Sequence, residues 1–425
     1  MANQSRENNI FYLNSIKTEN ISLSQQQNHL YQKILQLKPQ IPLYALRPND
    51  IARAANWFLN NFLGKILYSV KSNPDNLVLQ KLYESGIRNF DVASLNEIKL
   101  IDRLFSQKNK PAKMFFMHPI KSREAIRAAY FDYDIRDFSL DHEDELRKIL
   151  EVTNNASDLN LHLRLAIPNN HAAIDLSSKF GALPSEASNL AIKIRMAAKK
   201  FGICFHVGSQ CLEPLEYRSA INMVKEITDK SGIKIDVLDV GGGFPASYPN
   251  SQPPALKNYM NEIFAAIKAN DFADTEIWCE PGRALVANSG SLVVRIEARK
   301  ENMLYLNDGT YGGLFDAGHL LFTYPTQTWR FNEKINNLSQ KLVPFGLYGP
   351  TCDSLDTIKG PFYLPENIAE GDYIEIGNLG AYCNTLRTKF NGFDEVINIC
   401  VDDISQNSLF NFNEEQQLKT NNEHY

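Results

Sequence analysis

Residues 65–104 read KILYSVKSNPDNLVLQKLYESGIRNFDVASLNEIKLIDRL, and the pattern in this stretch decides the fold class. The apolar runs Lys65–Val70 and Asn89–Ala93 predict two buried strands, and the amphipathic segment Leu95–Leu104 predicts a helix after the second strand. Short apolar strands that alternate with amphipathic helices are typical of βα units and of a parallel sheet.

More runs of the same kind follow along the chain. They are Lys113–Met117, Asp134–Leu140, Asn160–Ala166, Gly202–Val207, Ile235–Val240 and Ile277–Glu280. With the first two they make eight parallel strands in roughly 240 residues, which fits a (β/α)₈ barrel, whose usual size is about 250 residues. An open doubly wound sheet is the alternative, but the strand count favours a closed barrel. The predicted class is therefore α/β, with a TIM-like barrel.

The chain beyond Arg283 has a different sequence pattern. Short β-rich runs are bounded by turn residues, without long helices between them, which predicts a β domain. These runs are Leu292–Ala298, Met303–Asn307, Tyr373–Ile376 and Val396–Val401. The polar segment Gln327–Lys341 is predicted to be an irregular surface excursion. We expect an N-terminal segment (1–43) that joins and completes the β domain, a barrel (44–285), the C-terminal β domain (286–405) and a polar tail (406–425).

Composition excludes several classes of function. The 425 residues carry 44 basic and 49 acidic side chains, a net charge of −5, and no basic stripe that would predict nucleic-acid binding. No apolar run approaches the roughly 20 residues of a membrane span. Residues 1–28 lack the apolar region of a secretory signal, so we expect a cytoplasmic protein. The six cysteines are scattered, without a CxxC pair, so neither a metal site nor a disulfide framework is expected.

Polar residues follow the predicted strands, where the active site of a barrel is built. Lys71 follows the first strand. If burial lowered its pKa, this lysine could form a Schiff base with a carbonyl compound. By itself, a lysine at a strand end is more often a solvated rim residue.

Three later strands end in further chemically capable residues. His206 follows the sixth strand, the run Gly241–Gly243 follows the seventh, and Glu280 with Arg283 follows the eighth. Taken singly, the histidine is more often a structural residue, the glycine run is equally a tight turn, and the alternative for the Glu/Arg pair is a structural ion pair. Together, a lysine, an imidazole, a glycine-rich anion site and a Glu/Arg pair predict a phosphorylated ring with a ring nitrogen and an aldehyde. That cofactor is pyridoxal phosphate (PLP).

Seven motifs in order, from about Tyr44 to Phe393, closely resemble the ornithine decarboxylase branch of the barrel-fold (alanine racemase-like, fold type III) PLP-dependent decarboxylases. The motifs are Tyr68-Ser-Val-Lys71-Ser-Asn, Phe90-Asp91-Val-Ala-Ser94, Phe205-His206-Val-Gly208-Ser209, Gly241-Gly-Gly-Phe-Pro245, Glu280-Pro-Gly-Arg283, Gly349-Pro-Thr-Cys352-Asp353-Ser-Leu-Asp356 and Gly380-Ala-Tyr382. Seven ordered motifs are far more specific than any one of them.

The resemblance implies roles for the residues of these motifs. Lys71 should hold the cofactor as a Schiff base, His206 should stack on the pyridine ring, and Glu280 should pair with the ring nitrogen. The implied phosphate ligands are Ser209, the backbone of Gly241, Gly242 and Gly243, Arg283 and Tyr382. Other positions that match residues near the cofactor are Asp91, Arg164 and, on a nearby helix, Glu97.

The resemblance also implies the reaction and the substrate. Cys352 matches the cysteine that returns a proton to the substrate carbon after CO₂ leaves, and it should enter the site from the partner subunit of a homodimer. Asp316 and Asp353 match the acidic pair that binds the distal ammonium of the substrate, and Phe390 is a further position expected at the substrate.

We therefore expect a diamino-acid decarboxylase. Its first reaction would convert L-ornithine to putrescine for polyamine biosynthesis. Its second would convert L-lysine to cadaverine, because one methylene discriminates by only about 1–3 kcal/mol.

Other functions remain open on the sequence. Diaminopimelate carries a distal carboxylate, which an acidic pair would repel, so its decarboxylation is the less favoured alternative. A racemase would need a second acid or base on the opposite face of the substrate carbon. An inactive regulatory binding homologue would be expected to lose the lysine or the phosphate ligands, and Lys71, His206, Glu280, Arg283 and Cys352 are all present.

Overall fold

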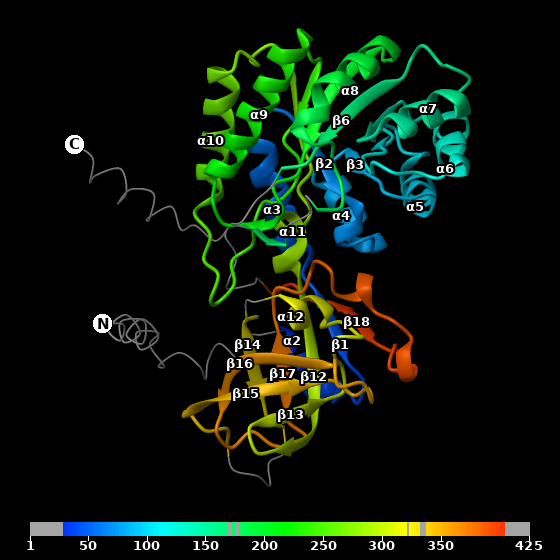
Figure 1. Ribbon diagram of the computed structural model, residues 1–425. Coiled ribbons are helices and arrows are strands. Elements are labelled where there is room, and N and C mark those ends of the chain that lie inside the picture. The colour runs from blue at the N-terminus through cyan, green and yellow to red at the C-terminus, as the bar shows by residue number, and fades with distance from the viewer. Residues whose placement is uncertain (1–28, 168–171, 175–177, 321–322, 332–336, 404–425) are drawn as a thin grey trace, which may run out of the picture.

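The computed structural model describes residues 29–167, 172–174, 178–320, 323–331 and 337–403. Figure 1 shows two bodies, a barrel of strands surrounded by helices above and a domain of curled strands below. Residues 1–28 and the predicted tail 406–425 lie outside the described residues. No helix in the described ranges is long and apolar enough to cross a membrane.

The upper body is a parallel eight-stranded barrel. In sheet order, its strands are β4 (Lys113–Phe115), β3 (Asn89–Asp91), β2 (Lys65–Ser69), β11 (Glu276–Cys279), β10 (Val237–Asp239), β8 (Lys200–Phe205), β6 (Asn160–Leu165) and β5 (Asp137–Leu140). A parallel bridge between Phe116 and Phe138 joins the two ends of this order. The prediction of a (β/α)₈ barrel is confirmed, and each of the eight predicted runs overlaps one strand.

Helices cover the outside of the barrel. They are α3 (Pro48–Asn61), α4 (Asn76–Glu84), α5 (Leu95–Phe105), α6 (Arg123–Arg127), α7 (Glu143–Val152), α8 (Pro184–Ala197), α9 (Leu215–Ser231) and α10 (Leu256–Ala269). Local signals set several of their ends. At α5, the Ser94 hydroxyl accepts from the Glu97 amide (3.3 Å), and Glu97 Oε2 accepts from the Ala93 amide (2.6 Å). This reciprocal arrangement resembles a capping box, and it fixes how the chain enters the helix.

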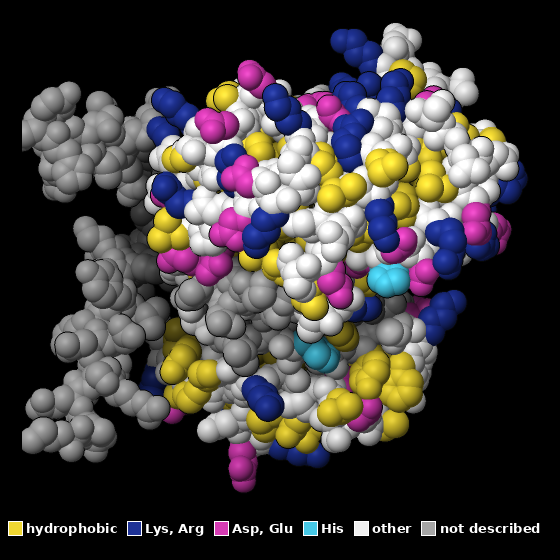
Figure 2. All heavy atoms as spheres, turned by 45° about the horizontal axis from the view of Figure 1, so that its top comes forward, with side chains coloured by type: hydrophobic (Ala, Val, Ile, Leu, Met, Phe, Trp, Pro, Cys, Tyr) yellow, Lys and Arg dark blue, Asp and Glu magenta, His cyan; other side chains and the backbone are white. Residues whose placement is uncertain are grey.

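Apolar side chains fill the barrel interior below its mouth. They form a separate buried cluster of Leu67, Phe115, Met117, Cys204, Val237 and Trp278. The barrel is therefore a packed core, as is usual for this fold. Because this cluster fills the interior, the charged and polar residues at the strand ends lie at the C-terminal mouth of the barrel. Basic and acidic side chains are interspersed over the outer face of the molecule seen in Figure 2.

The lower body is a second eight-stranded sheet. Its main path runs β14 (Thr326–Trp329), β17 (Tyr373–Ile376), β12 (Gly290–Lys300), β13 (Met303–Leu306), β15 (Leu342–Tyr348) and β16 (Thr357–Pro365), and β1 (Leu43–Leu46) and β18 (Ile397–Cys400) pair at its side. The four predicted β-rich runs overlap β12, β13, β17 and β18. The prediction of a C-terminal β domain is confirmed.

The N-terminal segment completes this sheet. Strand β1 pairs antiparallel with β12 and parallel with β18, so the predicted barrel start at Tyr44 falls inside a strand of the β domain. Helix α2 (His29–Leu37) buries Leu30 and Ile34 in a cluster with Val293 and Trp329. The reason for the misplaced limit is that β1 and the barrel strands are equally apolar, and only long-range pairing distinguishes them.

The expectation of an irregular excursion at Gln327–Lys341 is wrong for its first residues. Thr326–Trp329 form β14, which pairs antiparallel with β17 at one end of the sheet. Trp329 is buried against the N-terminal segment, whereas Gln327 is exposed. Polar residues are tolerated here because only one side of this end strand is covered. Strands β15 and β16 were not predicted at all, since Pro344, Gly346 and Pro361 interrupt their apolar patterns.

The β domain meets the barrel at the barrel's mouth. Asn73 Nδ2, just after β2, donates to the Gly380 carbonyl (2.7 Å), and the Tyr382 amide donates to the Ser72 carbonyl (2.9 Å). A buried ion pair between Arg47 and Glu375 (2.7 Å) adds to this contact. These bonds hold the loop that carries Tyr382 over the C-terminal ends of the barrel strands.

Candidate active site

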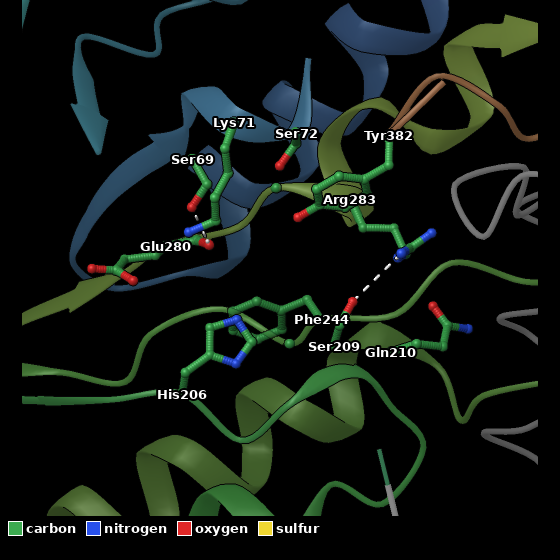
Figure 3. A pocket seen from close by; sticks show the side chains of 12 residues that line it. Ser69, Lys71, Ser72, His206, Ser209, Gln210, Phe244, Glu280, Arg283 and Tyr382 are labelled. Atoms are coloured by element: carbon green, nitrogen blue, oxygen red, sulfur yellow. Dashed lines mark hydrogen bonds between the residues drawn. The ribbon is translucent and has the colours of Figure 1, made fainter. Parts of the chain in front are cut away.

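A polar pocket opens at the mouth of the barrel, with about 290 Å³ of space free of protein atoms. Its lining comes from the ends of β2, β8, β10 and β11 and from the β-domain loop that carries Tyr382. The lining residues are Ser69, Lys71, Ser72, His206, Ser209, Gln210, Gly243, Phe244, Glu280, Gly282, Arg283 and Tyr382. In Figure 3, Glu280 lies at one end of the pocket, Arg283 and Ser209 lie at the other, and Lys71 and His206 face each other between them.

Lys71 stands in a single 3₁₀ turn (Val70–Ser72) that follows β2. Its side chain is 46% exposed toward the pocket, and Nζ lies 3.6 Å from Asp91 Oδ2. Asp91 in turn accepts from the Ser69 hydroxyl (2.9 Å). Burial lowers the pKa of Lys71, but the electrostatic influence of Asp91, and then of Tyr382 and Glu280, outweighs burial and raises the pKa above its usual value. The expected lowering of this pKa is therefore wrong, because desolvation was considered without the facing carboxylates.

Glu280 is a buried carboxyl group at the end of β11. Its pKa is well above the usual range, first because of burial and then because of the negative charges of Asp239 and Asp91. Lys71 and Arg164 act in the opposite direction. A cation placed against Glu280 would remove this cost, so the site is suited to a protonated ring nitrogen.

His206 is a neutral imidazole. Burial, followed by the positive charges of Arg164 and Lys71, holds its pKa well below the usual value. Nδ1 accepts from the Gly208 amide (2.9 Å), which leaves the proton on Nε2. A Cβ atom at position 242 would lie only 2.9 Å from Nε2, so Gly242 is needed for the ring to lie flat against this turn.

The glycine run forms a tight turn and also leaves donors for an anion. Gly241 and Gly243 have φ values of +68° and +104°, which favour glycine. The Gly241 amide donates to Asp239 Oδ1 (2.8 Å), so it is used inside the protein. Among the described residues, the amides of Gly242 and Gly243 donate to no partner. Of the three glycine amides predicted to bind the phosphate, only those of Gly242 and Gly243 are therefore available to do so.

Arg283 forms the cationic end of the pocket. Nη1 donates to Asp316 Oδ2 (2.7 Å) and to the Tyr248 hydroxyl (3.0 Å), and Nη2 lies 3.5 Å from the Ser209 hydroxyl. Nε is buried without a partner in the described part of the chain. The Tyr382 ring lies 5.1 Å from the guanidinium. The free edge of this arginine, with Ser209, can hold a phosphate.

Three more predicted cofactor residues do not line this pocket, but two of them act on residues that do. Asp91 holds Lys71, and the charge of Arg164 acts on both Glu280 and His206. Glu97 caps α5 and is not among the lining residues. The residues brought together are thus those predicted for the cofactor, and the helix residue supports the loop beside them.

The predicted substrate residues Cys352, Asp353 and Phe390 form a second cluster on the β domain. Cys352 is exposed, with Sγ 3.3 Å from Asn391 Oδ1. Asp353 Oδ2 accepts from the Tyr311 hydroxyl (2.5 Å), and the Tyr311 ring lies 4.7 Å from that of Phe390. None of these residues lines the Lys71 pocket of the same chain.

Asp316 lies apart from this second cluster. It stands in the short helix α12 (Phe315–His319), buried, and its Oδ2 binds Arg283 and accepts from the Tyr324 hydroxyl (3.0 Å). The acidic pair expected from the sequence is therefore not assembled within one chain. Asp316 belongs to the phosphate end of the pocket, and Asp353 belongs to the cluster with Cys352.

Several functional positions were missed by sequence reasoning. Ser72 and Asp239 stand inside or beside quoted motifs, and their position at strand ends was a usable signal. Phe244, which lines the pocket, also follows the glycine run directly. Tyr248 and Tyr324 carried no sequence signal, because only the folded chain brings them to Arg283.

The residues of the pocket fit pyridoxal phosphate. The Ser72 hydroxyl and the Nε atoms of Arg164 and Arg283 are buried and unpartnered within the described residues. Added Cβ atoms at Gly242 and Gly282 would collide with the pocket residues Glu280, His206 and Ser72. The lysine between an anionic and a cationic end matches a ring with a nitrogen at one end and a phosphate at the other. No group of three or more potential metal ligands was found in the described part of the chain.

Comparison with known proteins gives consistent results. Residues 49–287 match the family model for the pyridoxal-binding domain of pyridoxal-dependent decarboxylases. A lysine/ornithine decarboxylase of Selenomonas ruminantium is 32% identical over 336 residues, which cover 77% of this chain and 81% of that protein. Antizyme inhibitor 2 of Xenopus laevis is 32% identical over 367 residues, covering 78% of this chain and 74% of that protein.

A solved structure shares the whole architecture. It is a mutant of the Selenomonas ruminantium lysine decarboxylase in complex with PLP. It superposes with a TM-score of 0.76 and 27% identity, and the match covers 93% of this chain and 98% of that one.

Proposed function

Because this chain belongs to the pyridoxal-dependent decarboxylases, we propose that it decarboxylates a diamino acid, with L-ornithine as its first substrate and L-lysine as its second. The chain is a PLP-dependent amino-acid decarboxylase. The observation that carries the choice of substrate is the carboxylate of Asp353 next to Cys352. In cells, the products would be putrescine and cadaverine, and polyamine synthesis would be the pathway served. The cytoplasmic location expected from the sequence belongs to the same proposal.

The pocket residues divide the work around the cofactor. PLP, when bound, supplies an aldehyde that condenses with amines and a ring that accepts the electron pair left when CO₂ departs. Lys71 would provide the amine that holds the aldehyde, and Glu280 would keep a proton at the ring nitrogen. Ser209, Arg283 and the free glycine amides would bind the phosphate, while His206 would cover the ring and exclude water from it.

Asp353 is the carboxylate that we assign to the distal ammonium. Its pKa lies below the usual value, first because its side chain accepts from the Leu355 amide and then because it accepts from Tyr311. It is therefore negative at neutral pH, attracts a terminal cation and repels a terminal carboxylate. This disfavours diaminopimelate. Asp316 is already neutralised by Arg283, so we do not assign it to the ammonium.

We further propose that the active site is shared between two copies of the chain. Cys352, Asp353 and Phe390 lie on the surface of the β domain, outside the pocket that contains Lys71 of the same chain. A two-fold dimer would place each such cluster at the mouth of the partner's pocket and make two equivalent sites. Cys352 Sγ would then deliver a proton to the substrate carbon that has lost CO₂.

The deciding experiment is an assay of the purified protein loaded with PLP. Ornithine, lysine, arginine and diaminopimelate are compared as substrates, and released CO₂ and the amine product are measured. We expect the highest kcat/KM with ornithine, lower but measurable turnover of lysine, and none in the Lys71→Ala variant. Higher turnover of diaminopimelate than of either basic amino acid would overturn the assignment of the substrate. Absence of turnover with full PLP loading would instead support an inactive regulatory homologue.

A further inference from the structure

Asp239 is a buried acid directly beneath the pocket, and it is not one of the lining residues. It ends β10, with none of its surface exposed. Oδ1 accepts from the Gly241 amide (2.8 Å). Oδ2 is also buried, and among the described residues no N–H or hydroxyl group donates to it. The neighbouring group that can donate to Asp239 is the carboxyl of Glu280, and it can do so only when protonated.

Asp239 is connected to Glu280 through the backbone. Strands β10 and β11 are neighbours, with Asp239 in register with Trp278, two residues before Glu280. The Glu280 amide donates to the Gly241 carbonyl (2.8 Å), and the Gly241 amide is the group that Asp239 binds. The side chain of Asp239 thus holds the turn against which Glu280 is fixed.

The two acids also interact through charge. Burial is the main cause of the raised pKa of Glu280, and the charge of Asp239 is the next. The other charged groups that act on Glu280 are Asp91, Lys71 and Arg164. The pKa of Asp239 is raised to about 6, first by burial, while the Gly241 amide, the Glu280 carboxyl as a hydrogen-bond donor and His162 lower it. Two such acids share one proton unless a cation lies against them.

We propose that Asp239 is a positioning residue that acts through Glu280: it fixes the Gly241 turn behind Glu280, and its buried negative charge keeps the ring nitrogen of the bound cofactor protonated. This inference rests on the proposed binding of PLP, but not on the choice of substrate. The protonated nitrogen supplies the cation that the acid pair lacks. Asp239 and Glu280 can then both be ionised, and the Glu280 carboxylate meets the ring.

The alternative is a purely structural role, in which Asp239 only accepts the hydrogen bond from the Gly241 amide. Asparagine at position 239 separates the two roles, because its amide oxygen can still accept from the Gly241 N–H while the negative charge is removed. Serine offers a smaller neutral acceptor for the same N–H. A capping role predicts that both variants leave the ring nitrogen unchanged once PLP is bound.

The test measures the protonation of the ring nitrogen directly, in the full-length holoprotein without substrate. PLP labelled with ¹⁵N in the ring is loaded, and the ¹⁵N chemical shift is followed by NMR as a function of pH. In the parent protein we expect a protonated nitrogen through neutral pH. In Asp239→Asn we expect the pH of deprotonation to fall by about one unit or more, since removing a neighbouring opposite charge shifts a pKa by roughly 1–3 units.

Two further variants calibrate the shift. Glu280→Gln removes the direct partner and should give a neutral nitrogen. Asp229→Asn makes the same chemical change at an exposed aspartate of α9 that pairs with Lys225 and does not line the pocket, and it should leave the ¹⁵N titration unchanged. With ornithine as substrate, we also expect Asp239→Asn to lower kcat at least tenfold while KM changes less than twofold.

An Asp239→Asn holoprotein with the parental ¹⁵N titration would overturn the inference. If Asp239→Asn does not fold or does not bind PLP, the same ¹⁵N titration is measured in Asp239→Ser. A parental titration in Asp239→Ser would likewise overturn the inference. Loss of loading in both variants would show that Asp239 is needed for the fold of the site rather than for the proton, and would also overturn it. A parent protein that binds no PLP would refute the proposed function itself, whereas activity toward another amino acid would leave this inference standing.

Discussion

Asp316 and Arg283 form a buried ion pair, with 2.7 Å between Oδ2 and Nη1, at the end of the pocket opposite Glu280. Both side chains are almost fully inaccessible. The pair directs one edge of the arginine away from the pocket and leaves Nε and Nη2 for an anion. A residue expected at the substrate is thus the counter-ion of the phosphate-binding arginine.

Replacing Asp316 should therefore affect stability and cofactor binding before it affects the substrate. Asp316→Asn leaves the buried guanidinium without its counter-ion, a change that costs about 3–5 kcal/mol of folding free energy in other buried pairs. PLP brings a phosphate to the same guanidinium. Thermal unfolding should show a lower Tm and a larger increase on adding PLP than in the parent protein. An unchanged Tm with a raised KM for ornithine would instead place Asp316 at the substrate.

Asp353 should control the affinity for the distal ammonium. Asp353→Asn keeps the size of the side chain and removes its charge, so kcat/KM for ornithine and lysine should fall by roughly 10- to 100-fold, as expected for a charge-assisted contact. The loss should appear mainly in KM, and PLP loading should be parental. Steady-state kinetics with both substrates check this, and equal kcat/KM in variant and parent would remove Asp353 from the substrate site.

Lys71 should carry the cofactor covalently. The purified holoprotein should be yellow, and borohydride reduction followed by peptide mapping should find the pyridoxyl group on Lys71. The matched control is Lys121, a buried lysine whose Nζ donates to the His118 and Ser139 carbonyls and pairs with Glu145. Because these contacts occupy its amine, it should remain unlabelled. A label on any lysine other than Lys71 would contradict the assignment.

The shared active site predicts recovery of activity when two inactive variants are mixed. Lys71→Ala and Cys352→Ala should each be impaired alone. If subunits exchange freely, about half of the dimers are hybrids with one intact and one doubly damaged site, so roughly a quarter of the parental activity returns. Tagged subunits verify the exchange. A mixture as inactive as its components would mean that each site is built within one chain.

Glu276 should contribute to stability at acid pH. It lies at the bottom of the barrel, where it pairs with Lys65 (2.7 Å) and accepts from Trp278 Nε1 (2.9 Å). Burial raises its pKa, but the hydrogen bonds from Lys65 and Trp278 and the charges of Lys65 and Lys200 lower it to about 2.

The folded form therefore binds this proton more weakly than the unfolded form. The stabilisation by Glu276 is fully present above pH 4.5 and is lost as the pH falls toward 2. The free energy of unfolding, measured with urea at a series of pH values, should decrease less steeply toward acid pH in Glu276→Gln than in the parent. Identical slopes would show that this pair does not contribute.

The sequence by itself determined the barrel and the composition of its mouth. Alternating apolar and amphipathic runs are local patterns, and each of the eight predicted runs overlaps a barrel strand. Because parallel strands of a barrel end at the same rim, residues at strand ends, such as Lys71, His206, Glu280 and Arg283, had to converge there. The glycines of the 241–243 turn were likewise visible, since positive φ values restrict the residue type.

Only the tertiary structure decided what depends on partners distant in the chain. Strand β1 and the end strand β14 are placed by pairing with residues hundreds or tens of positions away. The sequence of β1 is as apolar as a barrel strand, and the sequence of β14 is mostly polar. The pKa of Lys71 is raised by Asp91, Tyr382 and Glu280, which three separate segments supply. Asp316 meets Arg283, not Asp353, for the same reason. A residue type shows which chemistry a side chain can perform, but burial and neighbouring charge, which the fold alone sets, determine which chemistry it performs.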